Sequence, residues 1–280
     1  MVINKNNAAV VVGLAACVWL SLAPSPANAQ SADRERGSVY IGTFITDRNT
    51  SARVDSDAGN PGSDVDLEGD LGLKASTSVL RAGGDFWLSR RQRLDVSYFD
   101  LSRSASRTID KTIDFDDKTF PINTVVSTDN QLTITKVDYT FAFLTRENWF
   151  FGVDAGLYVM QTRLSLSEPK LGTYSSQSLT APLPVVGFRG EYGINDRWTL
   201  RGAFQWFGIT LTDVSGHFTD TYAGVDRRLG KRFTVGLAYD TVALNIDVKK
   251  TEHLKGNLDW GYDGWLLYFR TDFGGGVSKR

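Results

Sequence analysis

The stretch LTITKVDYTFAFLTRENWFFGVDAGLYV, residues 132–159, decides the fold, because its side chains alternate in character on both sides of a short polar turn. Successive side chains of a strand point to opposite faces. One face of the first limb carries Tyr139 and Phe141, and one face of the second carries Phe151 and Val153. The pattern predicts a β-hairpin. Each limb has at least the roughly 9–11 residues with which a tilted strand crosses a bilayer.

Similar alternating segments recur along the chain and give ten candidate strands. They lie near residues 39–46, 79–88, 94–98, 132–144, 149–159, 183–194, 198–206, 217–227, 233–240 and 265–273. Short connections follow the even-numbered strands. The longer ones are 47–74, 102–130, 165–180 and the basic segment 249–257, of which 102–130 has enough β-branched residues to form a projecting hairpin. This predicts an all-β protein, a transmembrane antiparallel up-and-down barrel of ten strands, with eight to twelve as the range.

The first 29 residues are typical of a secretory signal peptide. A single charge, Lys5, precedes an apolar run, and Ala27-Asn28-Ala29 supplies a small-x-small cleavage site. One alternative is a lipoprotein signal, in which Cys17 becomes the lipidated first residue. Cleavage after Ala29 predicts a short periplasmic leader (30–37), a barrel (38–273) and a flexible tail (274–280).

Composition excludes several classes of function. Cleavage leaves 251 residues without cysteine, which excludes disulfides and thiolate metal sites, and 30 basic against 32 acidic residues give no overall basic surface for nucleic acid. No phosphate-binding glycine loop is present, and we expect no cofactor. Strand alternation alone also fits a soluble β-sandwich or lipocalin-like barrel, which remains the alternative fold.

Aromatic residues beside the short turns carry a resemblance to a known family. The set predicted to form an aromatic girdle is Phe143, Trp149, Tyr192, Trp198, Phe233 and Phe273. Together with the signal peptide and the final strand, in which Trp265, Leu267 and Phe269 alternate before Phe273, these residues make the chain resemble small single-chain bacterial outer-membrane β-barrel proteins. The resemblance implies the Gram-negative outer membrane, short periplasmic turns and long external loops. It also implies lipid, lipopolysaccharide and the barrel-assembly machinery as partners. The chain departs from the family by adding residues 274–280 after the last Phe.

Charged side chains on the faces opposite the apolar ones are predicted to line the lumen. They are Arg81, Asp85, Asp95, Lys136, Asp138, Asp154, Arg189, Glu191, Arg201, Asp240, Arg270 and Asp272. Unpaired charges in a narrow barrel would be costly. We therefore expect a mutually paired, hydrated plug, with a narrow ion-conducting path as the alternative.

An acidic loop gives a weak calcium candidate. Asp64, Asp66, Glu68 and Asp70 place oxygen ligands at alternate positions beside Gly69. The twelfth position of such a loop is Ala75 rather than the closing glutamate, so solvated carboxylates are the favoured interpretation.

Catalysis is the least favoured function. Some outer-membrane barrels are rim-located hydrolases that use Asp and His, and here His217 and His253 are the only histidines, with Asp213 and Asp220 near the first. No family motif surrounds them. The sequence favours a non-enzymatic structural or surface-interaction role, with porin-like passive uptake of small solutes or ions as the first alternative and a hydrolase as the second. Oligomeric state, ligand and surface partner are not defined by the sequence.

Overall fold

The computed structural model describes residues 36–55, 61–210, 214–248 and 256–274. All regular structure in these ranges is β-strand, and none of it is a helix long and apolar enough to cross a membrane. The predicted signal peptide with Cys17, most of the leader and tail, Asp213, His253 and the basic segment 249–255 lie outside the described residues.

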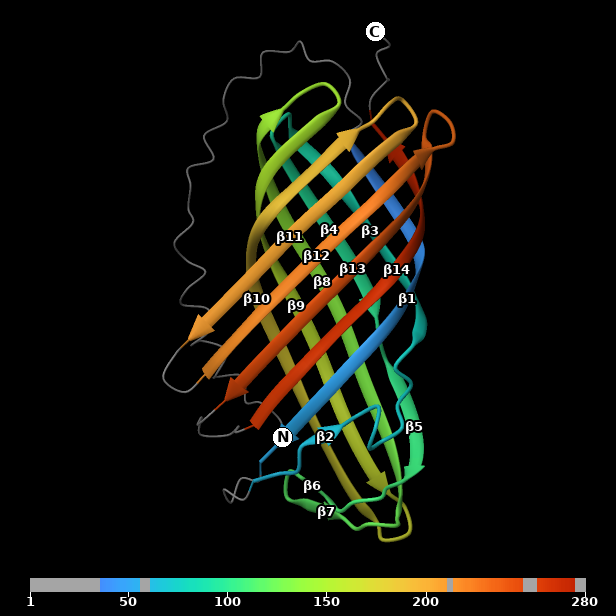
Figure 1. Cartoon of the computed structure of the whole chain (residues 1–280), viewed down its shortest axis with the longest axis vertical. Helices are drawn as coiled ribbons and strands as arrows, with labels where there is room; N and C mark the ends of the chain where they lie inside the picture. Colours follow the sequence, from blue (N-terminus) through green and yellow to red (C-terminus); the bar gives the residue numbers. More distant parts are fainter. Residues whose placement is uncertain (1–35, 56–60, 211–213, 249–255, 275–280) are drawn as a thin grey trace.

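Ten long antiparallel strands form the wall of a closed barrel (Figure 1). They are β1 (Gly37–Val54), β3 (Thr77–Ser89), β4 (Gln92–Asp100), β8 (Val125–Thr145), β9 (Trp149–Glu168), β10 (Thr173–Gly193), β11 (Trp198–Thr210), β12 (Val214–Arg228), β13 (Phe233–Val248) and β14 (Gly256–Phe273). The last strand pairs with the first along all 18 residues of β1. The predicted ten-stranded up-and-down barrel is confirmed.

The two ends of the barrel differ. The turn end holds the four short connections, β3–β4, β8–β9, β10–β11 and β12–β13, together with the start of β1 and the end of β14. The loop end holds the longer connections and four short strands, β2 (Val65–Asp66), β5 (Arg103–Thr108), β6 (Ile113–Phe115) and β7 (Lys118–Phe120). Because β5 pairs with β8 and β6 with β7, the region 102–130 does form projecting hairpin structure, as predicted.

The predicted loop 165–180 is wrong, and the predicted loop 47–74 is wrong in its first eight residues. The segment 165–180 is mostly strand, since β9 and β10 stay paired as far as Glu168 and Thr173 and only four residues connect them. Likewise β1 continues through residues 47–54 and pairs with β14. In both places the strands extend beyond the apolar zone, so their outward side chains are polar and the alternation on which the prediction relied disappears.

Outward-facing side chains form an apolar belt around the wall. All six predicted girdle residues lie beside the turn end, and five of them are between 38% and 51% exposed. Tyr98, Trp206, Tyr239 and Trp265 form a second girdle, beyond which outward residues such as Asp263 are polar. The nine residues from Trp265 to Phe273 span about 20 Å along the barrel axis after allowance for strand tilt. An exposed apolar band of this extent is not tolerated in water and excludes the soluble alternative.

Pairing around the wall is interrupted at one seam on the loop side. The β10–β11 ladder begins at Gly193–Thr199 and stops at Val186–Trp206, whereas β9 and β10 stay paired as far as Thr173. Figure 1 shows β10 and β11 diverging below this point. Within the described residues, the stretch 173–185 of β10 is therefore paired on one edge only.

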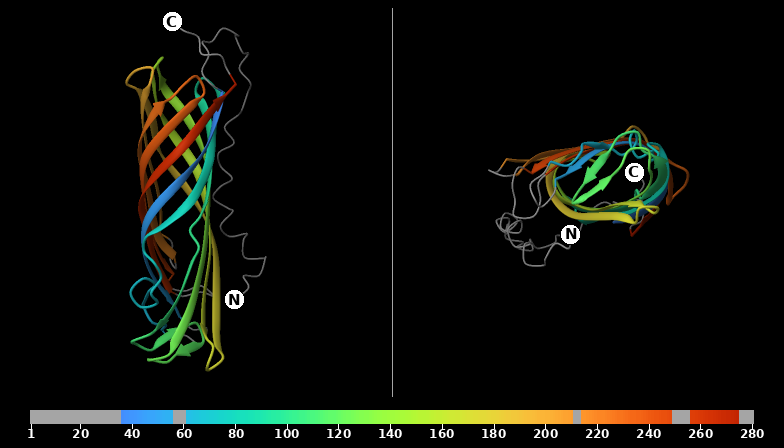
Figure 2. Two further views of the ribbon diagram at one scale, coloured as in Figure 1. Left: turned by 90° about the vertical axis from the view of Figure 1, so that its right-hand side faces the viewer. Right: turned by 90° about the horizontal axis from the view of Figure 1, so that it is seen from below.

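Two apolar clusters lie on the inner side of the wall. The lumen core fills the loop-side half of the lumen with aromatic and aliphatic residues, among them Phe44, Phe99, Tyr158, Phe218, Trp260 and Tyr262. The cap core lies at the loop end and consists of Val65, Leu67, Leu71, Leu73, Ile109, Ile113, Phe115, Phe120, Val126 and Leu166. Seen from the loop end, β6 and β7 lie within the outline of the barrel (Figure 2).

Candidate functional site

An ionic network fills the turn-side half of the lumen, and the structure places all twelve predicted lumen charges in it. All twelve side chains are largely buried, and each has an oppositely charged partner within 4 Å. They come from β3, β4, β8, β9, β10, β11, β13 and β14, so nearly every wall strand contributes. The network ties together strands that are far apart around the barrel.

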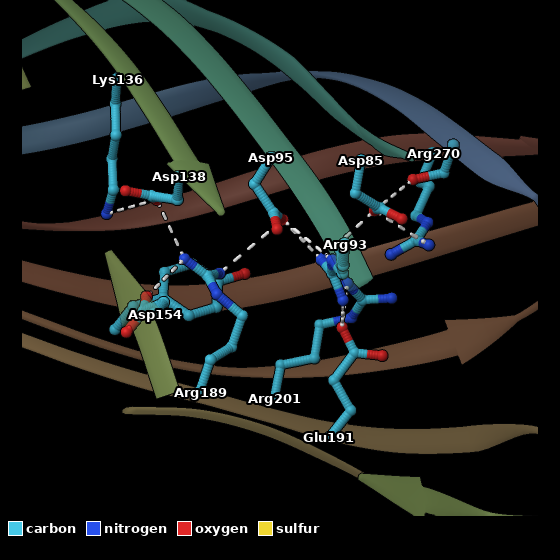
Figure 3. Close-up of polar contacts among 12 residues, drawn as sticks. Asp85, Arg93, Asp95, Lys136, Asp138, Asp154, Arg189, Glu191, Arg201 and Arg270 are labelled. Carbon is cyan, nitrogen blue, oxygen red and sulfur yellow. Dashed lines mark hydrogen bonds and ion pairs between the residues drawn. The ribbon is translucent and has the colours of Figure 1, made fainter. Parts of the chain in front are cut away.

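The middle of the network is organised by Arg189 (Figure 3). Its guanidinium lies 3.0 Å from Asp138, 3.4 Å from Asp154 and 3.8 Å from Asp95. The fully buried Gln205 amide donates to the carboxylates of Asp138 (3.0 Å) and Asp154 (2.7 Å). One cation and one amide therefore share three carboxylates, an arrangement that fixes the relative positions of β4, β8, β9, β10 and β11.

Nearer the turn end, Arg93 is the second centre of the network. It contacts Asp95 (2.6 Å), Asp85 (3.4 Å) and Glu191. Figure 3 shows Glu191 bonded to Arg93 and Arg270 approaching Asp85. The separations are 2.9 Å from Arg201 to Glu191, 2.6 Å from Arg201 to Asp226, and 3.2 Å from Arg270 to Asp85.

Toward the loop end the network meets the lumen core. Lys136 lies 2.6 Å from Asp220 and 3.5 Å from Asp138, and the Tyr158 hydroxyl donates to the same Asp220 carboxylate at 3.1 Å. The Arg81 guanidinium pairs with Asp240, and it also lies 4.7 Å from the centre of the Phe99 ring and 5.4 Å from that of Phe44. Cations stacked on aromatic rings join the polar and apolar halves of the filling.

Three members of the network were not predicted. Arg93 lies just before the strand predicted over 94–98, although it stands two residues before Asp95 and so shares its face. Asp220 and Asp226 lie on β12, whose outward face carries threonines at 219 and 221 and therefore alternates weakly. The even spacing from Asp95 is a signal for Arg93, whereas no predicted lumen residue lies on β12 to serve as a reference for Asp220 and Asp226.

Side chains occupy most of the lumen. A cavity of about 80 Å³ lies among the network residues, bounded by Tyr40, Arg81, Arg189 and Tyr268 among others. A second, of about 280 Å³, lies at the turn end between Trp87, Asn148 and Arg270. The first volume accommodates a few water molecules and no larger solute.

The weak calcium candidate forms a turn with protein partners. Asp66 Oδ1 accepts hydrogen bonds from the backbone N–H groups of Glu68 (3.0 Å) and Gly69 (2.9 Å), and Asp70 lies 2.6 Å from Lys111 Nζ. Glu68 pairs with Arg103, and the side chain of Asp64 is 70% exposed. Across the described ranges, no group of three or more His, Cys, Asp or Glu side chains is arranged to hold a metal ion.

The candidate hydrolase residues are separated by the barrel wall. His217 is exposed on the outer side of β12, whereas Asp220, three residues later, is buried in the lumen. Asp220 is engaged there by Lys136 and Tyr158. His217 and Asp220 therefore do not form a catalytic pair in this structure.

The loop end is covered by an ordered cap built on the cap core. The segment 61–73 is bonded to the β6–β7 hairpin through Ser63 N–H to Asp114 O (2.9 Å) and Lys111 Nζ to Asp64 O (3.1 Å). On the other side, Ser175 Oγ on β10 donates to Asp116 Oδ2 at 3.2 Å. The cap therefore connects strands on both sides of the barrel mouth.

Comparison with known proteins supports the fold. No family model and no curated protein sequence matches the chain. Among solved structures, the outer membrane protease OmpT from Escherichia coli is similar with a TM-score of 0.56 and 9% identity, covering 88% of this chain and 100% of that one. The attachment invasion locus protein Ail of Yersinia pestis matches with a TM-score of 0.36 and 11% identity over 87% of this chain and 100% of Ail. The translocator domain of NalP from Neisseria meningitidis matches with a TM-score of 0.35 and 9% identity over 88% of this chain and 90% of that domain. The closed ten-stranded architecture, the apolar belt and the likeness to OmpT make this chain an outer-membrane β-barrel in fold.

Proposed function

We propose that the protein is a non-conducting, non-enzymatic outer-membrane barrel that acts through surface interactions at its loop end. The carrying observation is the filled lumen, in which the ionic network and the lumen core lie one behind the other along the axis. An ion or solute would have to displace paired charges in one half and packed aromatic rings in the other. The proposal includes export by the Sec pathway with cleavage after Ala29.

The cap supports a role at the loop end. Its ten buried apolar residues give the connecting segments a core of their own, as in a small folded layer rather than a set of solvated loops. Structure of this kind at the exposed end of a membrane barrel presents side chains in defined positions, which is what recognition of another molecule requires.

The unpaired edge of β10 supplies a means of recognition. Residues 173–181 lie beyond the apolar belt and include neither a charge nor a proline, two of the devices with which proteins protect edge strands. Such an edge is complementary to an extended polypeptide segment, which adds to the sheet through main-chain hydrogen bonds. We propose an extended protein segment as the partner.

Two prolines define which backbone groups face the open edge. Alternate residues of a strand direct their N–H groups to the same edge. Pro182 and Pro184 have no N–H, yet β10 remains paired with β9 through both positions. They therefore belong to the set that faces away from β9. Ser178 is an even number of residues from both prolines, so its backbone N–H points to the open edge. The backbone N–H of Leu179 points to β9.

Conductance tests the filled lumen. We expect the purified protein in a planar bilayer to give no reproducible single-channel steps. The positive control removes filling from both halves of the lumen. It combines Tyr158→Ala and Phe218→Ala, whose rings lie 4.8 Å apart in the lumen core, with Arg93→Ala and Arg189→Ala in the ionic network. Steps from the unaltered protein would refute the proposal.

The edge is tested with a peptide that copies residues 160–168, the segment of β9 that already pairs with β10. We expect fluorescence anisotropy to detect its binding to the protein in detergent, and Ser178→Pro to abolish binding without loss of the heat-modifiable gel mobility of a folded barrel. The matched control Ser178→Thr changes the same position but keeps the backbone N–H, and it should bind the peptide as the unaltered protein does. Equal binding by the unaltered and Ser178→Pro proteins would exclude the edge as a docking site.

A further inference from the structure

Exposed cations surround the turn end of the barrel, and each of the four short turns contributes at least one. Arg90 and Arg91 lie between β3 and β4, Arg197 precedes β11, and Lys231 and Arg232 precede β13. All five are exposed. We call them the basic ring; the β8–β9 turn adds Arg146. The exposed acids on these turns are only Glu147 and Asp196, so the surface is strongly positive.

The apolar belt determines what the basic ring contacts. Arg197 directly precedes Trp198, and Arg232 directly precedes Phe233, both residues of the girdle. Girdle aromatics lie at the level of the lipid headgroups. A cation and a girdle aromatic are in contact at this level, since the Arg227 guanidinium lies 5.4 Å from the centre of the Trp198 ring. The basic ring is therefore continuous with the lipid-facing surface and lies at headgroup depth.

The opposite girdle carries the opposite charge. Next to Tyr98, Trp265 and the other residues of the second girdle, the outward residues Asp47, Asp100 and Asp263 are exposed. The Tyr239 hydroxyl donates to Asp263 at 2.6 Å, which places this carboxylate beside the girdle. The protein thus presents cations to the headgroups of one leaflet and carboxylates to those of the other.

We propose that the basic ring is a binding surface for the phosphate groups of anionic phospholipids in the leaflet at the turn end. Guanidinium groups bind phosphate through paired, charge-assisted hydrogen bonds, and cations near an anionic membrane surface each add to the attraction. The ring surrounds the barrel mouth, so several lipids are held at once, and the acidic girdle at the loop end confines this preference to one leaflet.

Lipid retention in native mass spectrometry tests the proposal. The full-length protein is released from mixed micelles that contain phosphatidylcholine and a minor fraction of phosphatidylglycerol. We expect phosphatidylglycerol to be retained about tenfold or more above its share of the mixture, and Arg91→Gln, Arg197→Gln, Lys231→Gln and Arg232→Gln together to abolish this preference.

The matched control removes the same number of exposed cations from the loop end, through Lys74→Gln, Lys118→Gln, Arg163→Gln and Lys170→Gln. Both variants have the same net charge, so a difference between them reports position. A third variant exchanges Lys and Arg at the four ring positions and is expected to keep the preference. Unchanged retention in the folded ring variant, or equal loss in the loop-end control, would overturn the proposal.

Discussion

Lys136→Met tests whether the lumen charges act as a paired network. The substitution keeps most of the side-chain volume and removes the cation that lies 2.6 Å from Asp220 and 3.5 Å from Asp138. Both carboxylates are nearly inaccessible to solvent. Removal of one partner of a buried ion pair leaves an uncompensated charge and costs about 3–5 kcal/mol. We expect the free energy of unfolding to fall by this amount, measured by urea titration of the vesicle-inserted protein with tryptophan fluorescence as the signal.

A double-mutant cycle separates loss of the pair from loss of packing. Asp220→Asn alone is also expected to destabilise the barrel. The double variant with Lys136→Met and Asp220→Asn should lose at least about 1 kcal/mol less unfolding free energy than the two single variants lose together. Lys118→Met, at an exposed position of β7, is the control and should stay within about 0.5 kcal/mol of the unaltered protein. A loss below about 1 kcal/mol for Lys136→Met, or strict additivity in the cycle, would refute the network interpretation.

Three further predictions concern other parts of the molecule. Phe141→Arg places a charge in the belt and should lower stability in lipid by about 2–4 kcal/mol. The control Thr140→Ser, on the inner side of β8, should leave assembly unchanged. The gel mobility of each unheated variant shows whether its barrel has assembled. Phe115→Ala should cost about 3–5 kcal/mol locally, detected as faster hydrogen exchange in the cap with the wall still protected, and equal acceleration in the wall would contradict an independent cap. Gly236→Val should destabilise the barrel by about 1–3 kcal/mol or more in the same urea titration, because a Cβ there would lie 2.1 Å from the Tyr268 ring. An unchanged urea midpoint would show that this ring moves freely.

Alternation predicted the part of the chain that lies in the membrane. There the outward side must be apolar, so Phe141 and Val153 contrast with Lys136 and Asp154, and the strands are visible in the sequence. Beyond the belt the contrast reverses. Leu166 faces inward to the cap core while Ser165 and Ser167 face outward, and a polar stretch of this kind predicts a loop. Strand length beyond the membrane depends on pairing between distant segments, which single-strand patterns do not encode.

The candidate site is likewise only partly predictable from the sequence. Alternation predicts the inner face for most of the charged residues. It misses Arg93, which lies just before the predicted strand 94–98, and Asp226, which lies on the weakly alternating β12. It also implied a polar lumen throughout. The structure instead fills the loop-side half with aromatic residues such as Phe44 and Phe218. Their positions depend on barrel diameter and strand stagger, which follow from closure of the whole sheet.

The joint between β1 and β14 has a consequence for how the barrel assembles. The other nine ladders of the wall join strands that follow one another along the chain, but this one brings Gly37 to Phe273. Contacts between such distant segments carry the largest loop-closure entropy and slow folding. We therefore expect this joint to form last, after the lipid-facing hairpins have inserted. Until that moment β1 and β14 each present a long unpaired edge, and a nascent barrel is at its most vulnerable to pairing with another chain.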